Sequence, residues 1–487
     1  MAEKESGAGV SYSTVDATYF EKRGLRRYAG VWSLWALGVA AVISGDFYGW
    51  NFGLAAGGFG GLLVATVIIT VMYVALCYSI AEMATALPHT GGAYSFARTA
   101  MGPWGGFITG LAENMEYVVT PAVVVVAIGS YMSAISQSLF GFDLPLWLWW
   151  AIFYAIFVGL NIVGVEASFK FTVFICGLAL AILAVFYVLA IPHFSWSAAM
   201  NVIPDEGNSV FLPKGITGVL YAFPFAIWFY LAIEELPLAA EESVGWQQNL
   251  PKGILYGLAT LVVTAVLTLF LNGGIAPDGA AGIGASAEPL FTGFKAIFGE
   301  EGVAAELLAL VAVAGLVASF HTIIFAYGRN IFSLSRAGYF PHWLSATHGT
   351  RKTPHVALIA GSVLGFVTCL IMQQATGQLL GAILYMAVFG AVIAYVMQFV
   401  SFIRLRTQLP NIDRPYRAWT GIGGAVIGGI IAAVSLIVCI VNPDYRPGVI
   451  GMLVWFVAGI IYFGVYGRHH LVRSPEEEFA LQHRKES

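Results

Sequence analysis

Charged residues are scarce in this sequence: Asp, Glu, Lys and Arg together make up 10% of the chain. A soluble domain carries roughly 25%, so the composition excludes an ordinary soluble globular protein. Hydrophobic residues reach 59% and the mean hydropathy is +0.80, which indicates an integral membrane protein whose surroundings are the lipid bilayer. The net charge of −4 gives no reason to expect nucleic acid as a partner.

Cysteines and catalytic motifs are also few. The four cysteines all lie inside apolar runs, and no CxxC spacing is present, so the sequence predicts neither a disulfide framework nor a metal site. HExxH, GxSxG and P-loop motifs are lacking, which argues against a membrane enzyme and against a bound cofactor. The first 28 residues are polar and contain no apolar core, so we expect no cleavable signal peptide.

Long hydrophobic runs are what the sequence does contain. A helix needs about 20 apolar residues to cross a bilayer, and twelve segments of about that length or more are present. They are residues 30–55, 60–86, 103–136, 146–164, 168–191, 215–239, 252–272, 303–337, 354–374, 378–404, 421–441 and 447–467. The sequence therefore predicts an all-α integral membrane protein with twelve transmembrane helices.

The basic residues predict how these helices are oriented. If the N-terminus is cytoplasmic, only Lys214, Lys295 and Arg446 fall outside, which leaves 20 of the 23 basic residues inside. Cytoplasmic loops carry the excess of Lys and Arg in membrane proteins. Both termini are therefore expected in the cytoplasm.

Two of the segments carry signals of a broken helix. The first reads "ISGDFYG" at 43–49, with two glycines and an acid. The sixth reads "GVLYAFPFAIWFYLAIEELPLAAEES" and carries Pro224, the acids Glu234 and Glu235, and then Pro237. Irregular backbone at membrane depth is tolerated only where it is buried in protein or lines a cavity. Two such breaks five segments apart predict inverted five-helix repeats with a substrate site near the midplane.

Four stretches outside the breaks carry a resemblance to a known family. They are "YVALCYSIAEMATALPHTGGAYSFARTAMGPWGGFITG" (73–110), "LAAEESVGWQQNLPKGI", "YGRNIFSLSRAGYFPHWL" and "FIRLRTQLPNIDRPYRA". Over residues 30–420 the chain resembles the amino acid–polyamine–organocation (APC) transporter superfamily. The resemblance implies a LeuT-like 5+5 inverted-repeat fold with helices 1 and 6 broken at mid-membrane. It divides the chain into tails at 1–28 and 468–487, a ten-helix core at 29–407, and helices 11 and 12 at 408–467.

The turn in helix 1 separates this chain from amino-acid carriers of the superfamily. Those carriers have a Gly-Ser-Gly turn whose free N–H groups hold the substrate carboxylate, whereas the corresponding residues here are Ser44, Gly45 and Asp46. Two like charges ~4 Å apart at an effective dielectric near 20 disfavour each other by about 4 kcal/mol, and opposite charges attract equally. This departure from the amino-acid carriers predicts that the substrate is a cationic amine that has no carboxyl group.

Further candidate residues surround Asp46 in this interpretation. The resemblance implies that Glu113 and Glu116 of helix 3 face the pocket, that Glu234 lies at the cytoplasmic gate, and that helix 6 unwinds near residues 228–232. Aromatic rings can form a wall around an ammonium, each cation–π contact contributing about 0.5–2 kcal/mol. The rings we expect there are Phe47, Tyr48, Trp50, Trp228 and Tyr230, and Phe229 in the unwound stretch is a further substrate-binding candidate.

These features together resemble the ethanolamine permease branch, so the predicted function is secondary active import of ethanolamine by alternating access. Asp46 or Glu116 would bind the ammonium, and Asn51 or a backbone carbonyl would bind the hydroxyl. An amino-acid or polyamine symporter or exchanger of the same superfamily is the alternative, and a membrane amine sensor is a more distant one. The expected location is the plasma membrane, specifically a bacterial inner membrane. The oligomeric state stays open.

The coupling ion is left open between protons, sodium and none. Ser319 and Thr322 of helix 8 could contribute hydroxyl oxygens to a sodium site together with carbonyls of helix 1, because hard cations prefer oxygen ligands. His321, which lies between Ser319 and Thr322 in the sequence, is expected to be a packing residue. Glu234, expected half-buried between an aromatic segment and the cytoplasm, is the better candidate for carrying a proton, because a buried carboxyl group holds a proton more readily. Glu113 is a second candidate for gating or proton coupling.

Overall fold

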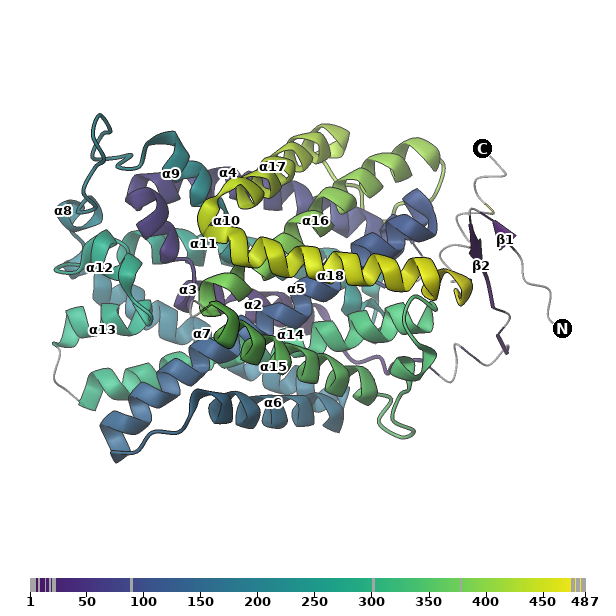
Figure 1. The fold of residues 1–487 in the computed structure, drawn as a ribbon, viewed down its shortest axis with the longest axis horizontal. Coiled ribbons are helices and arrows are strands. Elements are labelled where there is room, and N and C mark those ends of the chain that lie inside the picture. The colour runs from purple at the N-terminus through teal and green to yellow at the C-terminus, as the bar shows by residue number, and fades with distance from the viewer. Residues whose placement is uncertain are drawn as a thin grey trace.

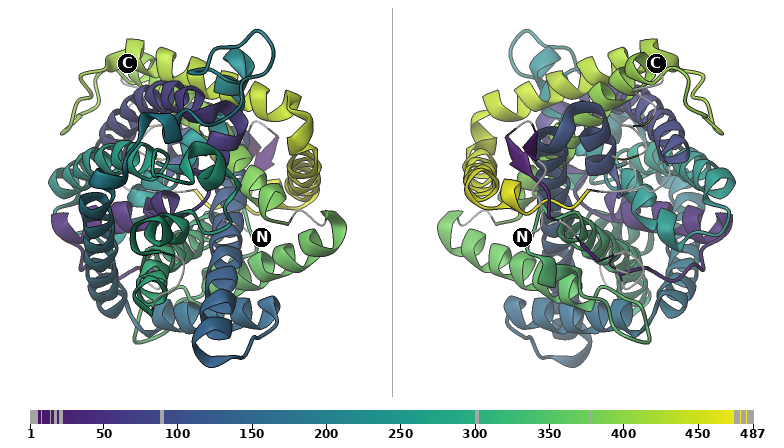
Figure 2. Two further views of the ribbon diagram at one scale, coloured as in Figure 1. Left: turned by 90° about the vertical axis from the view of Figure 1, so that its left-hand side faces the viewer. Right: turned by 90° about the vertical axis from the view of Figure 1, so that its right-hand side faces the viewer.

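The computed structural model describes residues 6–7, 9–13, 15–16, 19, 23–87, 91–299, 303–376, 379–473, 478 and 482. These residues form a bundle of helices that is elongated in side view and rounded when seen from either end (Figures 1 and 2). The strands β1 (Ser6–Gly7) and β2 (Val10–Ser11) and the C-terminal end of α18 (Arg446–Val465) lie at one end of the bundle, which we call the terminal side (Figure 1). Helices α8 (Trp196–Ala199), α12 (Gly279–Ala285) and α13 (Pro289–Phe298) lie at the other end, which we call the opposite side (Figure 1).

Ten long helices run through the bundle. They are α4 (Phe52–Ala86), α5 (Ala93–Phe140), α6 (Leu146–Val163), α7 (Val165–Ala190), α11 (Trp246–Leu271), α14 (Val303–Arg336), α15 (His355–Thr376), α16 (Leu379–Gln408), α17 (Gly421–Val441) and α18 (Arg446–Val465).

Two further crossings are divided into short pieces. The first contains α2 (Val31–Val42) and α3 (Ser44–Phe47), and the sixth contains α9 (Gly215–Tyr221), α10 (Phe223–Trp228) and the 3₁₀ helix η2 (Ile233–Glu242). Together with the ten long helices they account for all twelve predicted segments. By length and hydropathy, ten helical spans in the described part of the chain can each cross a membrane. They are the sixth crossing and the long helices other than α14.

The connecting elements are short. On the opposite side they are η1 (Ile191–His193), α8 (Trp196–Ala199), α12 (Gly279–Ala285), α13 (Pro289–Phe298) and η4 (Pro443–Tyr445), and on the terminal side η3 (His342–Ser345) and η5 (Gly467–His469). The prediction of a purely helical chain needs one small correction. Two strands of two residues, β1 (Ser6–Gly7) and β2 (Val10–Ser11), pair antiparallel near the N-terminus.

Two helices are longer than the hydrophobic pattern predicts, because each one joins two helical segments across a glycine. In α4 the joint is Gly58 (φ 70°), so the end of the first crossing runs into the second. In α5 it is Gly102 (φ 78°), which joins residues 93–101 to the third crossing. In α5 residues 93–101 are partly polar, so hydropathy leaves them out of the third crossing. In α4 the added residues are apolar, and hydropathy assigns them to the end of the first crossing.

Polar groups of the two chain ends hold the N-terminal segment against the terminal side. Tyr12 pairs with Leu471 in a parallel bridge, and the Ser13 amide donates to the Leu471 carbonyl over 2.7 Å. Further along, the Tyr19 hydroxyl donates to the carbonyl of Arg336 at the end of α14 over 3.0 Å. The described part of this tail is therefore attached to the helix bundle. The boundaries predicted for the tails and the ten-helix core stay predictions.

Candidate functional site

The breaks in the first and sixth crossings lie against each other. A Cβ built on Gly45 would lie 2.3 Å from the carbonyl oxygen of Trp228, and one on Gly49 (φ 94°) would lie 2.6 Å from the Trp228 indole nitrogen. Only glycine allows the two backbones to approach this closely, and Gly49 also needs the left-handed conformation. In the sixth crossing the helix stops after Trp228, and Ala232 has a φ of 88°.

Asp46 lies at this junction with its side chain turned toward α11. The residue is 1% exposed, and its Oδ1 accepts a hydrogen bond from the Thr268 hydroxyl over 3.0 Å. Thr268 Oγ1 lies 2.7 Å from the hydroxyl of Tyr187, which also donates to the Thr264 carbonyl over 3.1 Å. Among the described residues no Lys or Arg forms an ion pair with Asp46. The fold therefore buries the Asp46 carboxyl group next to hydroxyl groups, and it has no ion-pair partner among the described residues.

The turn around Asp46 is more regular than the sequence predicts. Residues Ser44–Phe47 form one helical turn, α3, where unwound backbone was expected. The Asp46 and Tyr48 amides donate to the carbonyls of Ile43 (3.0 Å) and Ser44 (2.9 Å), and the Ser44 amide donates to the Ser319 hydroxyl (2.9 Å). These three N–H groups already have acceptors, so they are not free to hold a carboxylate.

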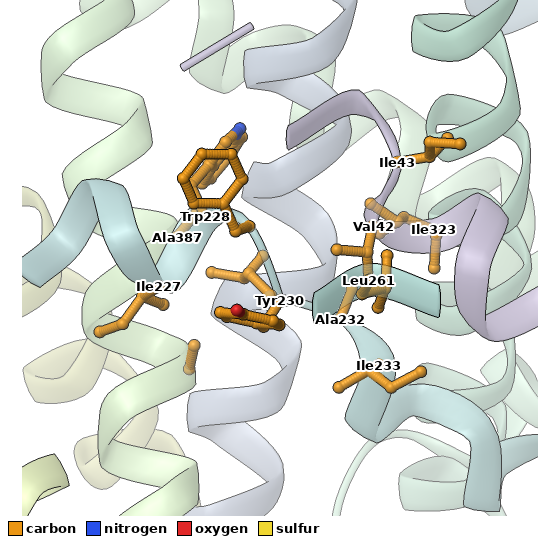
Figure 3. Packing of buried hydrophobic residues seen from close by; sticks show 14 of the residues in the cluster. Val42, Ile43, Ile227, Trp228, Tyr230, Ala232, Ile233, Leu261, Ile323 and Ala387 are labelled. Carbon is orange, nitrogen blue, oxygen red and sulfur yellow. The ribbon is translucent and has the colours of Figure 1, made fainter. Parts of the chain in front are cut away.

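Aromatic residues from both breaks pack close to the junction. Trp50 stacks on Phe229 with ring centroids 5.6 Å apart, and Tyr230 packs on Tyr73 of α4 at 5.0 Å. Trp228 and Tyr230 appear together in Figure 3, with Val42 and Ile43 of the first crossing beside Ile323 of α14. Trp228 itself is the last residue of α10 rather than part of the unwound stretch.

The remaining rings of the predicted wall have different surroundings. Tyr48 makes an edge contact with Phe52 at 5.6 Å, and its buried hydroxyl has no hydrogen-bond partner among the described residues. The same holds for the buried Trp50 indole N–H within the described ranges. Phe47 lies against α14, where a Cβ on Gly315 would be 2.4 Å from its ring. Polar groups on Tyr48 and Trp50 are thus available near the break.

Asn51 connects the break to the loop on the opposite side. Its Nδ2 donates to the carbonyls of Ile283 in α12 and of Ser286, both over 2.9 Å, and its Oδ1 accepts from the Gly49 amide over 3.2 Å. Both N–H groups of the Asn51 amide and one lone pair of its oxygen are therefore used within the protein. This leaves Asn51 at most one acceptor position for the substrate hydroxyl, whose other predicted partner is a backbone carbonyl.

Glu116 and Glu234 form a second acidic position on the terminal side of the breaks. The two buried side chains are close enough to interact electrostatically. Neither oxygen of Glu116 accepts a hydrogen bond from an N–H group or a hydroxyl in the part of the chain that the structure describes. The pair joins α5 to η2, which belong to different halves of the predicted repeat.

A chain of tyrosine hydroxyls extends from Glu234. Tyr395 of α16 donates to Glu234 Oε1 over 2.8 Å, and the Tyr73 hydroxyl lies 2.8 Å from that of Tyr395. The Ala232 amide also donates to Glu234 Oε1 over 3.1 Å. Four elements, namely α4, α5, α16 and η2, therefore meet at this acid.

Glu113 has a different environment, although it lies only three residues before Glu116. Its two carboxyl oxygens accept from the amides of Ala93 (3.1 Å) and Tyr94 (3.2 Å), the first residues of α5. A carboxylate that receives the free N–H groups at a helix start satisfies them and complements the helix dipole. Glu113 thus caps α5, and its predicted part in gating or proton coupling stays a prediction.

The candidate sodium ligands connect α14 to the first crossing. The Ser319 hydroxyl donates to the Ala40 carbonyl over 2.7 Å and accepts from the Ser44 amide. Thr322 bonds to carbonyls of its own helix. The adjacent His321 is 0% exposed and makes hydrogen-bonding contacts with Asn161 and Ser168, as expected of a packing residue. A cation-binding role for Ser319 and Thr322 stays a prediction.

Ion pairs close the terminal side beneath the acids. Arg329 of α14 holds Glu242 of η2 through two hydrogen bonds of 2.9 and 3.2 Å, and both side chains are buried. Two turns further along α14, Arg336 pairs with Glu241. Glu82 of α4 accepts from Arg406 over 2.8 Å and lies 3.1 Å from Arg414. Contacts between helix 6 and α14 therefore help to close the terminal side.

We expect loss of the Arg329–Glu242 pair to destabilise the protein strongly. Removal of one partner of a buried ion pair leaves an uncompensated charge, which costs about 3–5 kcal/mol. Arg329→Met should therefore lower the melting temperature of the purified protein markedly. The double variant Arg329→Met/Glu242→Leu should recover much of that loss, since no charge is then stranded. A double variant as unstable as the sum of the two single changes would contradict this explanation.

Sequence reasoning missed several partners of the predicted residues. Thr268 contacts Asp46 and is joined to Tyr187, and Tyr73 and Tyr395 extend from Glu234. A weak signal existed in α11, where Thr264 and Thr268 are polar residues one turn apart in an apolar helix. Nothing in the pattern indicates which other helix those hydroxyls face.

Two broken helices packed against each other in a bundle with twelve predicted crossings, with buried acids at the junction, define the class as a membrane transporter. Residues 34–474 match the family described as amino acid permease, and the chain belongs to this family. This finding confirms the predicted APC superfamily. The protein is a multi-pass transporter and not an enzyme, and the bacterial relatives described next support a location in the plasma membrane.

Several relatives are similar over most of their length. The uncharacterized transporter R00093 of Rhizobium meliloti is 28% identical over 80% of this chain and 82% of its own. The methylthioribose transporter of Bacillus subtilis is 24% identical, covering 92% and 95% of the two chains. The branched-chain amino acid permease BcaP of the same species is 26% identical, covering 94% and 96%.

Solved structures confirm the predicted fold. Mhp1, a nucleobase-cation-symport-1 family transporter, in a closed conformation with bromovinylhydantoin bound, superposes with a TM-score of 0.54 at 18% identity. The alignment covers 95% of this chain and 99% of Mhp1. The inward-facing conformation of Mhp1 gives a TM-score of 0.53 at 17% identity. The likeness shows that the fold is LeuT-like.

Proposed function

We propose that this transporter imports a small cationic amine that lacks a carboxyl group, with ethanolamine as the favoured substrate. The observation that carries the proposal is Asp46, an acid buried at the meeting point of the two broken helices with no cationic side chain of the described residues paired to it. An ionisable side chain inside a membrane protein is costly and marks a functional site by default. A substrate ammonium is the partner that the proposal supplies.

The hydrogen bonds of the turn already occupy two of the three amides at residues 44–46, which argues against a carboxylate receptor there. The amides of Ser44, Asp46 and Tyr48 already have acceptors within the protein. A substrate carboxylate placed near Asp46 would also be repelled by about 4 kcal/mol at ~4 Å and an effective dielectric near 20. An ammonium in the same place gains that amount. The occupied amides and the charge repulsion both disfavour a substrate carboxylate at this position.

The parts of ethanolamine have different partners in this proposal. Asp46 binds the ammonium, with Glu116 as the second acid on the terminal side. The rings of Tyr48, Trp50 and Trp228 face the cation, and a backbone carbonyl of the break accepts the hydroxyl, because Asn51 is engaged with the α12 loop.

Coupling and orientation complete the proposal. Glu234, which lies near Glu116 and accepts a hydrogen bond from Tyr395, carries a coupling proton; a sodium ion at Ser319 and Thr322 is the alternative. The terminal side faces the cytoplasm of a bacterial cell, so both termini lie inside. The Arg329–Glu242 contact then belongs to the cytoplasmic gate, which must open in alternating access.

An amino-acid carrier is the second candidate, and the relatives favour it. Besides BcaP, they include a protein described as a probable GABA permease from Pseudomonas aeruginosa, 24% identical over 84% of this chain. An amino acid next to Asp46 would require that acid to be protonated or paired with another cation. The two candidates therefore differ in whether the substrate carries a carboxylate.

Uptake into proteoliposomes tests the proposal. We expect concentrative uptake of labelled ethanolamine that excess unlabelled ethanolamine blocks and excess L-serine, L-alanine or L-valine leaves unchanged. Empty liposomes and the Gly45→Ala variant are the negative controls. Uptake of an amino acid that ethanolamine does not compete with would overturn the proposed substrate class and favour the second candidate.

A further inference from the structure

A long apolar groove lies on the outer surface of the bundle, away from the breaks. It has a volume of about 1050 Å³ and runs between α15 and α18, with α5, α14 and α16 as its floor. Ala360 and Leu364 line one wall, Val454 and Ala458 line the other, and Leu111 belongs to the floor. In Figure 1 the yellow α18 and the green α15 cross the front of the molecule, with α5 and α14 between them.

The groove has the length of a membrane leaflet or more. Its wall on α18 extends from Arg446 to Tyr462, and at 1.5 Å per residue this helix segment spans about 24 Å. The hydrocarbon core of a bilayer is about 30 Å thick, so the acyl chains of one leaflet need roughly half of that. Both walls are helices at the periphery of the bundle, where Leu364 and Val454 are 40% and 65% exposed. Acyl chains can therefore enter from the side.

A positive charge lies at one end of this groove. Arg446 is the first residue of α18, is exposed, and forms no ion pair with any residue that the structure describes. An arginine at the end of a membrane helix is at the level of the lipid headgroups. Its planar guanidinium forms paired hydrogen bonds with phosphate oxygens. The remaining wall residues are mostly apolar along the length of the groove.

We propose that this groove binds one phospholipid with an anionic headgroup. The headgroup phosphate pairs with Arg446, and the acyl chains lie between α15 and α18 over Leu111 and Ala458. The combination of a cation at the headgroup level with an apolar channel beneath it fits an anionic lipid better than a second copy of the chain. A protein partner would have to present both a complementary apolar ridge and an acid at the same height.

The floor of the groove connects the lipid to the transport core. The Leu111 carbonyl accepts a hydrogen bond from the Trp455 indole of α18 over 3.2 Å. Asn114 also lines the groove and donates to Asn330 of α14 over 3.2 Å. Both floor residues belong to the stretch of α5 that carries Glu113 and Glu116. A bound lipid therefore packs against the helix on which these acids lie.

Native mass spectrometry of the purified full chain tests this inference without any transport measurement. The protein is extracted in a mild detergent from vesicles that contain equal amounts of phosphatidylglycerol and phosphatidylcholine. We expect wild type to retain phosphatidylglycerol through purification. Ala458→Phe, which fills the groove, should lose it, and Arg446→Gln should lose the preference for phosphatidylglycerol over phosphatidylcholine. Val457→Phe places the same ring on a position of α18 that is 53% exposed and outside the groove, so it should behave like wild type.

Other results would overturn the proposal that the groove binds an anionic phospholipid. Equal lipid retention in wild type and Ala458→Phe would overturn the inference, as would an unchanged preference in Arg446→Gln. A lipid-free dimer that Ala458→Phe splits would assign the groove to a second copy of the chain. If Ala458→Phe fails to give a monodisperse protein, the Arg446→Gln result decides, because this change at an exposed helix end removes no core packing.

Discussion

Replacement of Asp46 by asparagine is expected to abolish ethanolamine uptake while the protein still inserts and folds. Asparagine has nearly the same shape and keeps an oxygen that can accept the hydrogen bond from Thr268. It removes the negative charge, whose attraction for an ammonium ~4 Å away is about 4 kcal/mol at an effective dielectric near 20. Affinity should fall by up to roughly 1,000-fold. Proteoliposome uptake and a direct binding titration measure the loss.

Thr268→Val is the matched control for that change. It removes the hydroxyl that donates to Asp46 but leaves the carboxylate in place. A single hydrogen bond to a charged group contributes about 1.5–3 kcal/mol, and the substrate ammonium can take over part of it. We therefore expect a milder loss in Thr268→Val than in Asp46→Asn. Near-normal ethanolamine affinity in Asp46→Asn would contradict the proposed role of the carboxylate.

The second large effect is expected from Gly45→Ala. The added methyl group would lie 2.3 Å from the Trp228 carbonyl oxygen and 3.1 Å from its carbonyl carbon. Both are backbone atoms, so no rotation of a flexible side chain can relieve the clash. Forced overpacking typically costs about 1–3 kcal/mol, and here it separates the two broken helices that form the site. Transport should fall at least roughly tenfold, the equivalent of about 1.4 kcal/mol, with normal membrane expression.

Gly177→Ala provides the comparison for this test. Gly177 lies in α7, and a Cβ added there would meet no neighbouring atom within 4 Å, so an alanine should be tolerated. Glycine-to-alanine changes in helix interiors even tend to stabilise by about 0.5–1 kcal/mol. Normal transport by Gly45→Ala would mean that the breaks are not in close contact in the working transporter.

Much of the fold follows from features that the sequence makes visible. Hydropathy finds the twelve crossings because each needs a long apolar run, and the glycines and prolines mark where the first and sixth crossings are interrupted. The opening in the sixth crossing falls close to the predicted stretch, because α10 ends at Trp228. Pro224 lies in the first turn of α10, directly after α9 ends at Tyr221. A proline is tolerated in a first helical turn, where its missing N–H is not needed.

The direction of the polar side chains is what the sequence leaves open. Asp46 is expected from the sequence to face the substrate, and in the fold its carboxyl group contacts Thr268, 222 positions away. Glu113 and Glu116 share a helical face, yet one caps α5 and the other lies near Glu234. Asn51, a candidate for binding the substrate hydroxyl, is engaged by α12. Such contacts depend on tertiary packing, which periodicity within one helix does not specify.

The Glu116–Glu234 pair illustrates the same limit of sequence patterns. Each acid is visible by itself as a charge inside an apolar helix. Their proximity depends on how α5 packs against η2, and Tyr395 and Tyr73 join them only because α16 and α4 converge there. Sequence patterns therefore identify the acids, while the fold identifies which of them act as a unit.

The most direct test of the central claim is a calorimetric titration of the purified protein with ethanolamine and with L-serine. The two ligands share the ammonium and the hydroxyl, and serine differs by its additional carboxylate. We predict saturable binding of ethanolamine that Asp46→Asn removes, and no detectable binding of serine. Serine binding as tight as that of ethanolamine would contradict the claim, because a carboxylate would then be accommodated beside Asp46.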